Sequence, residues 1–190
     1  PIAQNRARLH RGEGAAFLHL ETSEIVKSRK SKPLAQVKGY GNACDAYHQT
    51  ASSPEGKGAM LAMQAALKMS GLKNSDINYI NAHGTGTPNN DESEGNAIIN
   101  VFGKVPPPVS STKSLTGHTT SASGGVEAVI SILAINHDFI PANANFKTPM
   151  EALSFTPVKE IIQNIEVKNV LSNSFGFGGN NTSLIFSKVF

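Results

Sequence analysis

The chain has 190 residues, which is enough for one sizeable hydrophobic core or two small ones. Apolar residues make up 39% and charged residues 16%, as in an ordinary globular domain, and the net charge of +3 is too weak to indicate a nucleic-acid-binding surface. The single cysteine, Cys44, excludes an internal disulfide framework and fits a reducing compartment. No apolar run could span a membrane and no signal-peptide core opens the chain, so we expect a cytoplasmic protein.

Hydrophobic periodicity predicts an alternation of strands and helices. In chain order the predicted elements are strands at 15–20 and 34–40, a helix at 55–70, a strand at 76–82, a helix at 91–102, a strand at 108–112, a helix at 121–136 and strands at 170–175 and 182–189. The first two strands are expected to pair antiparallel around the basic loop 27–32, and residues 39–54 to form an irregular loop. This order predicts an α/β fold with a mixed sheet.

The helix at 121–136 is the clearest of the predicted elements. Its apolar residues recur at helical spacing, so they are expected to supply the face that packs in the core. These residues are Val126, Val129, Ile130, Ile132 and Leu133.

Three short stretches place polar groups beside glycines at the end of an apolar run. They are Asn81–Thr87, Ser111–His118 and Asn173–Asn181. Glycines there let the backbone approach a ligand closely. Together the stretches offer two histidines, a lysine, threonines, aromatic rings and free backbone N–H groups, which suit the stabilisation of negative charge on an oxygen. They contain no obvious nucleophile.

Two histidines and one acidic residue stand out by position. His83 follows the strand at 76–82, at the sheet edge where α/β proteins bind ligands; a structural histidine is the alternative. His118 precedes a helix whose N-terminus is expected to lower its pKa and keep the imidazole neutral. Glu127 lies in that apolar helix and needs a buried partner, for which Lys113 is the natural candidate.

The remaining candidates are weaker. Phe175 and Phe177 flank Gly176, and we expect Phe175 to pack in the core and Phe177 to be mobile. A lone cysteine can be a nucleophile, but Cys44 lies in a polar loop beside Asp45, whose charge would raise the thiol pKa, so a catalytic role is not expected. His83 and Asp91 lack the close pairing of a zinc site and no cysteine cluster is present, so no metal site is indicated. The glycine loop Gly176–Gly179 precedes a strand and does not open a helix as a phosphate loop does.

The three stretches, in this order and spacing, closely resemble the C-terminal half of β-ketoacyl-[acyl-carrier-protein] synthases, especially elongating type II enzymes and polyketide ketosynthases. Shorter likenesses extend over the whole chain, at Gly12–Ala15, Asp45–His48, Asn90–Asp91 with Glu94, and Ser123–Ala128. The resemblance implies a thiolase-like αβαβα sandwich. Residues 1–50 would be the end of its N-terminal half, with the last two strands of that half, and residues 51–190 would be the C-terminal half.

The resemblance also implies a decarboxylating Claisen condensation. An acyl group sits on a cysteine, a malonyl thioester on the carrier protein loses carbon dioxide, and the resulting carbanion attacks the acyl thioester. Carried over to this chain, His83 and His118 would donate hydrogen bonds to the malonyl thioester oxygen. Lys113 would hold the local charge network, with Glu127 as its partner.

Other positions of the family site also have counterparts. Thr85 and Thr87 would contact the phosphopantetheine arm, which arrives on the carrier protein, so no resident cofactor and no metal are expected. Phe177 would gate the malonyl pocket and its backbone N–H would help to form the oxyanion hole. Gly178 would give that gate its backbone freedom, and Phe175 would support it.

The chain departs from the family in lacking the nucleophile. The family cysteine lies in a small-residue elbow that is absent here, and Cys44 does not match it. Ala3, Arg8 and Asn89 replace residues that are usually acidic, glycine and apolar. The chain is interpreted as a truncated piece or a naturally split subunit, without condensing activity by itself.

Three functions stay open: a catalytic half-site, a non-catalytic partner like chain-length-determining subunits, and a carrier-binding module. Retention of His83, Lys113 and His118 favours the first of these. The expected partners are acyl carrier protein and the N-terminal ketosynthase half or a second subunit. A homo- or hetero-oligomer is therefore expected, without nucleic acid or membrane.

Overall fold

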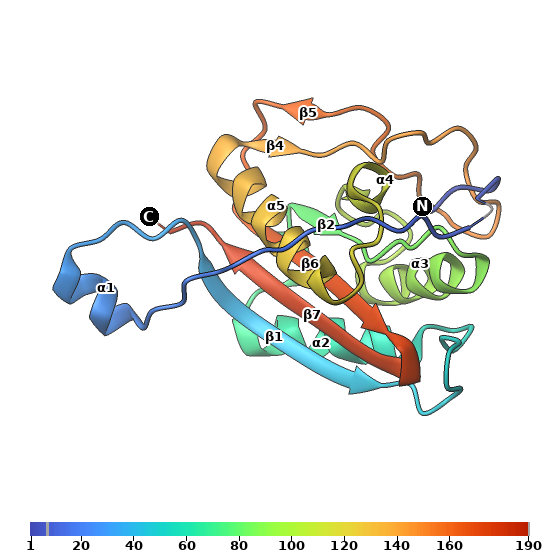
Figure 1. Ribbon diagram of the computed structural model, residues 1–190, viewed down its shortest axis with the longest axis horizontal. Coiled ribbons are helices and arrows are strands. Elements are labelled where there is room, and N and C mark those ends of the chain that lie inside the picture. Colours follow the sequence, from blue (N-terminus) through green and yellow to red (C-terminus); the bar gives the residue numbers. More distant parts are fainter. Residues whose placement is uncertain (7, 190) are drawn as a thin grey trace.

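A five-stranded mixed sheet organises the chain, of which the computed structural model describes residues 1–6 and 8–189 (Figure 1). Its helices and strands are α1 Ser23–Arg29, β1 Gln36–Cys44, α2 Lys57–Ser70, β2 Tyr79–Asn81, α3 Pro88–Phe102, β3 Val109–Ser110, α4 Lys113–Thr116, α5 Ser123–His137, β4 Phe139–Ile140, β5 Ile162–Gln163, β6 Asn169–Gly176 and β7 Asn180–Ser187. Short 3₁₀ turns lie at Asn74–Asp76, Thr120–Ala122 and Phe177–Gly179. The predicted α/β fold with a mixed sheet is confirmed.

The strand order of the large sheet is β1-β7-β6-β2-β3. β6 and β7 form an antiparallel hairpin, and β1 adds to β7 antiparallel. β2 pairs parallel with both β6 and β3, so that Ile80 lies opposite Leu171 on one side and Val109 on the other. Parallel strands end at the same edge of a sheet. The loops that follow β2, β3 and β6 therefore meet at one edge.

Helices cover both faces of the sheet, because alternate strand residues point to opposite sides (Figure 1). Ile80, Leu171 and Ile185 pack with residues of α2 and α3 in one buried cluster. Their neighbours in the strands, among them Tyr79 and Val170, pack with α5 in a second cluster on the opposite face. The sheet is thus buried on both sides, as in a layered α/β domain.

Glycines in β1 let that strand lie against the alanine-rich face of α2. A side-chain carbon on Gly41 would stand 2.1 Å from the carbonyl oxygen of Ala62, and one on Gly39 would stand 2.4 Å from that of Ala66. No larger residue fits at either position without moving the helix. This close packing explains why residues 39–44, predicted as a loop, continue the strand through Cys44.

The predicted hairpin of residues 15–20 and 34–40 is wrong. Residues 15–20 form no strand, and the partner of β1 is β7. The predicted basic loop 27–32 instead begins within α1. Thr22 caps this helix by accepting a hydrogen bond from the Ile25 N–H, and basic residues lie in its last turn. The capped helix α1 and the pairing of β1 with β7 are therefore favoured over the hairpin that the alternating apolar residues predicted.

The predicted buried face of α5 is confirmed only at Ile132, which packs against the second cluster. It is wrong at the other positions, because Val126, Val129 and Ile130 are only half-buried and Leu133 is exposed. The buried residues are smaller or polar: Ser123, Glu127, Ala128, Ser131, Ala134 and Ile135. Small residues are needed because the helix lies close to β6, where a side-chain carbon on Gly124 would stand 3.1 Å from the Ser174 hydroxyl oxygen.

The other predicted elements are confirmed with shifted ends. α2 ends at Gly71, whose φ of 70° gives the expected left-handed cap. α3 begins at Pro88, earlier than predicted, because proline suits the first position of a helix. The boundary proposed between residues 50 and 51 stays a prediction. Among the described residues, no helix is both long and apolar enough to cross a membrane.

Candidate active site

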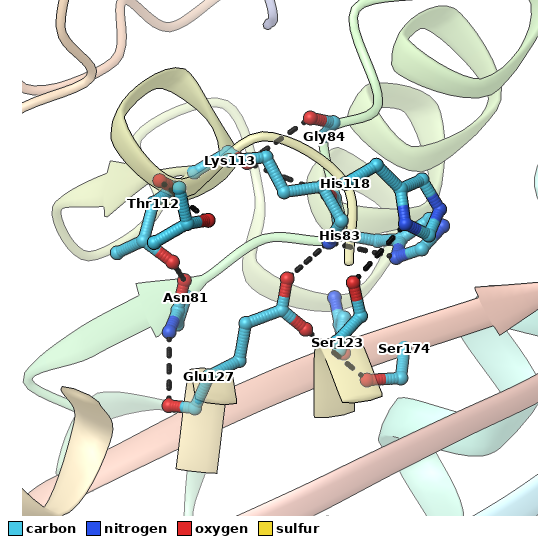
Figure 2. Close-up of polar contacts among 12 residues, drawn as sticks. Asn81, His83, Gly84, Thr112, Lys113, His118, Ser123, Glu127 and Ser174 are labelled. Carbon is cyan, nitrogen blue, oxygen red and sulfur yellow. Dashed lines mark hydrogen bonds and ion pairs between the residues drawn. The ribbon is translucent and has the colours of Figure 1, made fainter. Parts of the chain in front are cut away.

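Side chains from one loop and two helices meet at the edge where the parallel strands end (Figure 2). His83 follows β2, Lys113 begins α4 just after β3, and Glu127 reaches the same place from α5. His83, Lys113 and Glu127 are only 4%, 6% and 2% exposed. The sheet therefore assembles a buried polar cluster from residues that lie far apart in the chain.

Lys113 links two members of this cluster (Figure 2). Its ammonium forms an ion pair with the Glu127 carboxylate, which confirms the expected contact. The Lys113 Nζ also lies 3.1 Å from the Nδ1 of His83. A lysine ammonium can only donate, so His83 Nδ1 accepts and the ring proton resides on Nε2. His83 is thus held as a neutral imidazole with one N–H free to donate.

His118 is held in the same tautomer by different partners. The backbone N–H of Thr120 donates to His118 Nδ1 over 3.0 Å, and the Ser123 hydroxyl lies 3.1 Å from the same nitrogen. A backbone N–H can only donate, so the ring proton of His118 also resides on Nε2. The centroids of the His83 and His118 rings are 5.3 Å apart in an edge-to-face arrangement. Two neutral N–H donors therefore lie side by side.

The environment keeps both imidazoles neutral. Burial, followed by the charge of Lys113, lowers the pKa of His83 well below its usual value. The pKa of His118 is lowered by the same two effects, in the same order. The predicted direction for His118 is confirmed, but the predicted cause was a helix N-terminus. Burial is the main cause, and the turn Thr120–Ala122 separates His118 from the start of α5.

Glu127 is the acidic residue of this network. Burial raises its pKa to about 7, although the ion pair with Lys113 and a hydrogen bond from Ser174 oppose that rise. The Ser174 hydroxyl donates to Glu127 Oε2 over 3.3 Å. Both carboxylate oxygens thus have partners, which is what a buried acid requires.

A second buried carboxylate, Glu94, shapes the loop that carries His83. Its two oxygens accept hydrogen bonds from the backbone N–H groups of His83 and Gly84, each over 2.8 Å. Asn173 donates to Glu94 Oε1 over 3.1 Å, which ties this loop to β6. Glu94 has no role that is predicted from the sequence alone. The available signal was its spacing of three residues from Asp91, which puts two acids on one face of α3.

Asp91 acts on the same loop. Its Oδ1 accepts a hydrogen bond from the Gly86 N–H over 3.1 Å, and Arg6 Nε lies 3.6 Å from its Oδ2. Asp91 and Glu94 therefore both bind the backbone of the stretch that follows β2. Helix α3 serves as the support of the His83 loop.

Thr85 lines an open cleft of about 860 Å³, and Thr87 contacts Thr85. Their hydroxyl oxygens are 2.8 Å apart, and Thr85 lines the cleft with Lys113. Basic residues also line it, among them Arg8, Arg11 and Lys147. The cleft thus connects a basic surface with the buried lysine of the cluster.

The two phenylalanines of the third stretch differ as expected in burial. Phe175 is 9% exposed and its ring centroid lies 5.6 Å from that of His83, so it packs in the core. Phe177 is 82% exposed. Gly178 has a φ of 80°, and its N–H donates to the Gln49 carbonyl over 2.7 Å. The gating role of Phe177 stays a prediction.

Cys44 lies apart from the histidines, at the end of β1. Its thiol is exposed and donates to the Gly178 carbonyl over 3.4 Å. Within the described part of the chain, no group of three or more histidine, cysteine, aspartate or glutamate side chains is arranged to hold a metal ion.

Comparison with known proteins identifies the family. Residues 34–147, more than half of the chain, match the family model described as beta-ketoacyl synthase, C-terminal domain. The chain belongs to the beta-ketoacyl synthase family. The matched region contains His83, His118, Lys113 and Glu127. Its fold is the thiolase-like α/β fold of ketosynthase C-terminal halves.

Individual relatives agree with this assignment. A 3-oxoacyl-[acyl-carrier-protein] synthase 2 of Staphylococcus aureus is 41% identical over 190 residues, covering 99% of this chain and 46% of the relative. The structure described as the ishigamide ketosynthase/chain length factor aligns with a TM-score of 0.95 at 36% identity, over 100% of this chain and 47% of that one. A chain of the structure described as a type II PKS acyl-carrier protein in complex with its ketosynthase aligns with a TM-score of 0.95 at 30% identity, over the same shares. The chain therefore spans just under half the length of these relatives.

Breaking the buried ion pair should make the loss of stability depend on pH. Lys113→Ala leaves Glu127 buried without its cation, which costs about 3–5 kcal/mol of unfolding free energy at pH 8. The pKa of Glu127 is already raised, and losing Lys113 raises it further. When the pKa of a carboxyl group is higher in the folded than in the unfolded protein, stability is lost as pH rises. The loss of unfolding free energy in Lys113→Ala, relative to the unmodified protein, should therefore be smaller at pH 6 than at pH 8.

Urea unfolding of both proteins at the two pH values measures this difference. In the double variant Lys113→Ala, Glu127→Gln the carboxylate is gone, so the deficit should no longer grow with pH. A deficit of Lys113→Ala that is equal at pH 6 and pH 8 would contradict the ionised pair.

Proposed function

We propose that this chain is the malonyl-activating part of a β-ketoacyl-[acyl-carrier-protein] synthase, which performs a decarboxylating condensation of acyl and malonyl thioesters. The observation that carries the proposal is the pair of neutral imidazoles, His83 and His118, with their rings 5.3 Å apart. Both have Nδ1 occupied and Nε2–H available. Two such donors are suited to one oxygen atom that gains negative charge.

In this mechanism the thioester oxygen of the malonyl group accepts hydrogen bonds from His83 and His118. The bond to the carboxylate breaks, carbon dioxide leaves, and the electron pair forms an enolate whose oxygen carries the charge. The two N–H groups stabilise that charge without giving up a proton. The enolate carbon then attacks the acyl thioester on a cysteine, and the cysteine thiolate leaves. That cysteine would come from the part of the synthase outside these residues.

The Lys113–Glu127 pair serves this mechanism indirectly. Lys113 donates to His83 Nδ1 and so keeps the proton on Nε2. Its positive charge also opposes protonation of either imidazole. Glu127 compensates that charge in the buried site. The pair thus preserves the donors over a range of pH in which an exposed histidine would become charged.

The cleft supports a carrier protein as the bearer of the substrate. Its rim contains Arg8, Arg11 and Lys147, and it leads to Thr85 and Lys113. Cations at an entrance favour a partner with negative charge, such as the phosphate of a phosphopantetheine arm. Thr85, together with the adjacent Thr87, would bind this arm. The similarity to a ketosynthase bound to an acyl-carrier protein agrees with this proposal.

A second ketosynthase half or subunit is proposed as the other partner. The outer face of α5 presents half-buried valines and isoleucines, with Leu133 at 42% exposure. The nearby segment 14–16 crosses this helix, and Phe17 and Leu20 beyond it are 93% and 71% exposed. Apolar groups gathered in this way mark an interaction surface.

A non-catalytic chain-length-determining partner is the alternative function. The similarity at 36% identity to a structure named as a ketosynthase/chain length factor favours it. The site favours catalysis, because a buried lysine and glutamate are expensive to keep unless they serve the histidines. Variants of His83 and His118 distinguish the two functions.

In the complete synthase, His83→Ala and His118→Ala should each lower malonyl decarboxylation by about 100- to 1,000-fold, the usual effect of losing one oxyanion donor. Acyl transfer to the cysteine should be affected less. His19→Ala is the matched control, since its side chain is 78% exposed. Release of labelled carbon dioxide measures the first reaction and intact-mass analysis the second. Unchanged decarboxylation in both variants would favour the non-catalytic function.

The proposed gate is tested at Gly178. Gly178→Val should slow condensation, because φ is 80° there and valine resists that conformation. The loss of turnover should be larger than the loss of stability alone explains. Gly71→Val is a matched control, because Gly71 has a φ of 70° and, like Gly178, open space around it. Both variants should lose similar stability, and only Gly178→Val should lose turnover. Equal turnover in the two variants would remove Phe177 from the mechanism.

The 190 residues by themselves should form no acyl-enzyme. Incubation with an acyl-carrier protein followed by intact-mass measurement should show no adduct, because Cys44 has no general base beside it among its observed contacts. Cys44→Ser is the control. A stable acyl adduct that disappears in Cys44→Ser would make this chain an enzyme in its own right.

A further inference from the structure

The segment 10–12 runs beside the backbone of His118. The two form a parallel bridge between Arg11 and His118. The N–H of His118 donates to the His10 carbonyl over 2.7 Å, and the N–H of Gly12 donates to the His118 carbonyl over 3.1 Å. Both backbone polar groups of His118 are therefore bonded to this distant segment. It lies outside residues 34–147, the region that matches the family model.

The two chain segments approach so closely that neither tolerates a side chain at the crossing. A side-chain carbon on Gly12 would stand 2.0 Å from the Thr116 carbonyl oxygen and 3.3 Å from the carbonyl carbon of Gly117. A side-chain carbon on Gly117, whose φ is 68°, would stand 2.9 Å from the nitrogen of Gly12. The atoms in the way belong to the backbone, so no rotamer change relieves the contact. A residue larger than glycine at position 12 must displace the loop that leads to His118.

We propose that Gly12 is a positioning residue for His118, because its bare backbone allows segment 10–12 to hold the histidine beside His83. The inference rests on the proposed function, in which both imidazoles donate to one oxygen. Gly12 touches neither imidazole in the contacts observed and contributes no side-chain chemistry. It acts on the backbone from which the His118 ring projects.

The surroundings of His118 explain why a backbone shift matters. Its Nδ1 is bonded to the Thr120 N–H and the Ser123 hydroxyl, which lie in the following turn. Displacement of Thr116 and Gly117 would move the histidine relative to those donors and relative to His83. Catalytic groups that must meet one atom are sensitive to such shifts: misplacement by about 1 Å can cost about 100-fold in rate.

The test compares Gly12→Ala with Gly14→Ala in the complete synthase. A side-chain carbon on Gly14 would meet only the methyl groups of Thr119 and Val126, at 3.5 and 3.7 Å, which are ordinary contacts. Gly12→Ala should lower malonyl decarboxylation by about 100-fold while acyl transfer to the cysteine changes little. Gly14→Ala should leave both reactions near the unmodified level. Equal effects of the two variants would overturn the proposal.

A second readout does not depend on activity. Imidazole ¹⁵N spectra report the tautomer of each histidine, and the His118 signal is identified by its loss in His118→Asn. In Gly12→Ala this signal should shift, and the pKa of His118 should rise toward its ordinary value as burial is relieved. An unchanged His118 signal would overturn the positioning role whatever the activity. A shifted signal with unchanged decarboxylation would leave positioning intact and refute the proposed function of His118.

Hydrogen exchange in the unmodified protein tests the same contact without the Gly12→Ala variant. In the unmodified synthase, the amide hydrogens of His118 and Gly12 donate to each other's segments. They should therefore be protected from hydrogen exchange and should open together. Free exchange of the His118 amide in the unmodified protein would show that segment 10–12 does not hold it.

Discussion

The buried ion pair between Lys113 and Glu127 is the interaction on which the rest of the site depends. Two charges with little exposure are stable only when paired and hydrogen-bonded, so α4 and α5 must lie at a set distance from each other. The same lysine decides where the proton of His83 resides. One interaction thus links the packing of two helices with the protonation of an imidazole. Removing either partner would affect both.

Carboxylates support the site at two levels. Glu127 neutralises the cation beside the histidines, and Glu94 binds the backbone that carries His83. The pKa of Glu94 is raised by burial, although three hydrogen bonds oppose that effect. The histidine loop is consequently held by side-chain acceptors on α3 rather than by strand pairing. The His118 loop is held differently, by backbone bonds to segment 10–12. Each donor therefore has a support of its own.

Much of the fold could be predicted because it follows from short-range rules. The spacing of apolar residues located α2, and Gly71 marked its end. The predictions were wrong where contacts with distant segments decide the local structure. Residues 15–20 alternate like a strand, but β1 pairs with β7. The apolar stripe of α5 predicted the wrong buried face, since close approach to β6 selects small residues such as Ala128. Sequence periodicity alone does not register such a neighbour.

The sequence by itself determined which chemical groups are available and in which loops they lie: His83 and His118 beside glycines, Lys113 after a short strand, and Glu127 in an apolar helix that demands a partner. These features depend on residue type and local order. Only the tertiary structure decided the tautomers, the role of Glu94 and the approach of Gly12 to Gly117. Those features depend on contacts between segments far apart in the chain, and differences of tenths of an ångström in these contacts matter. Local sequence carries no measure of such distances.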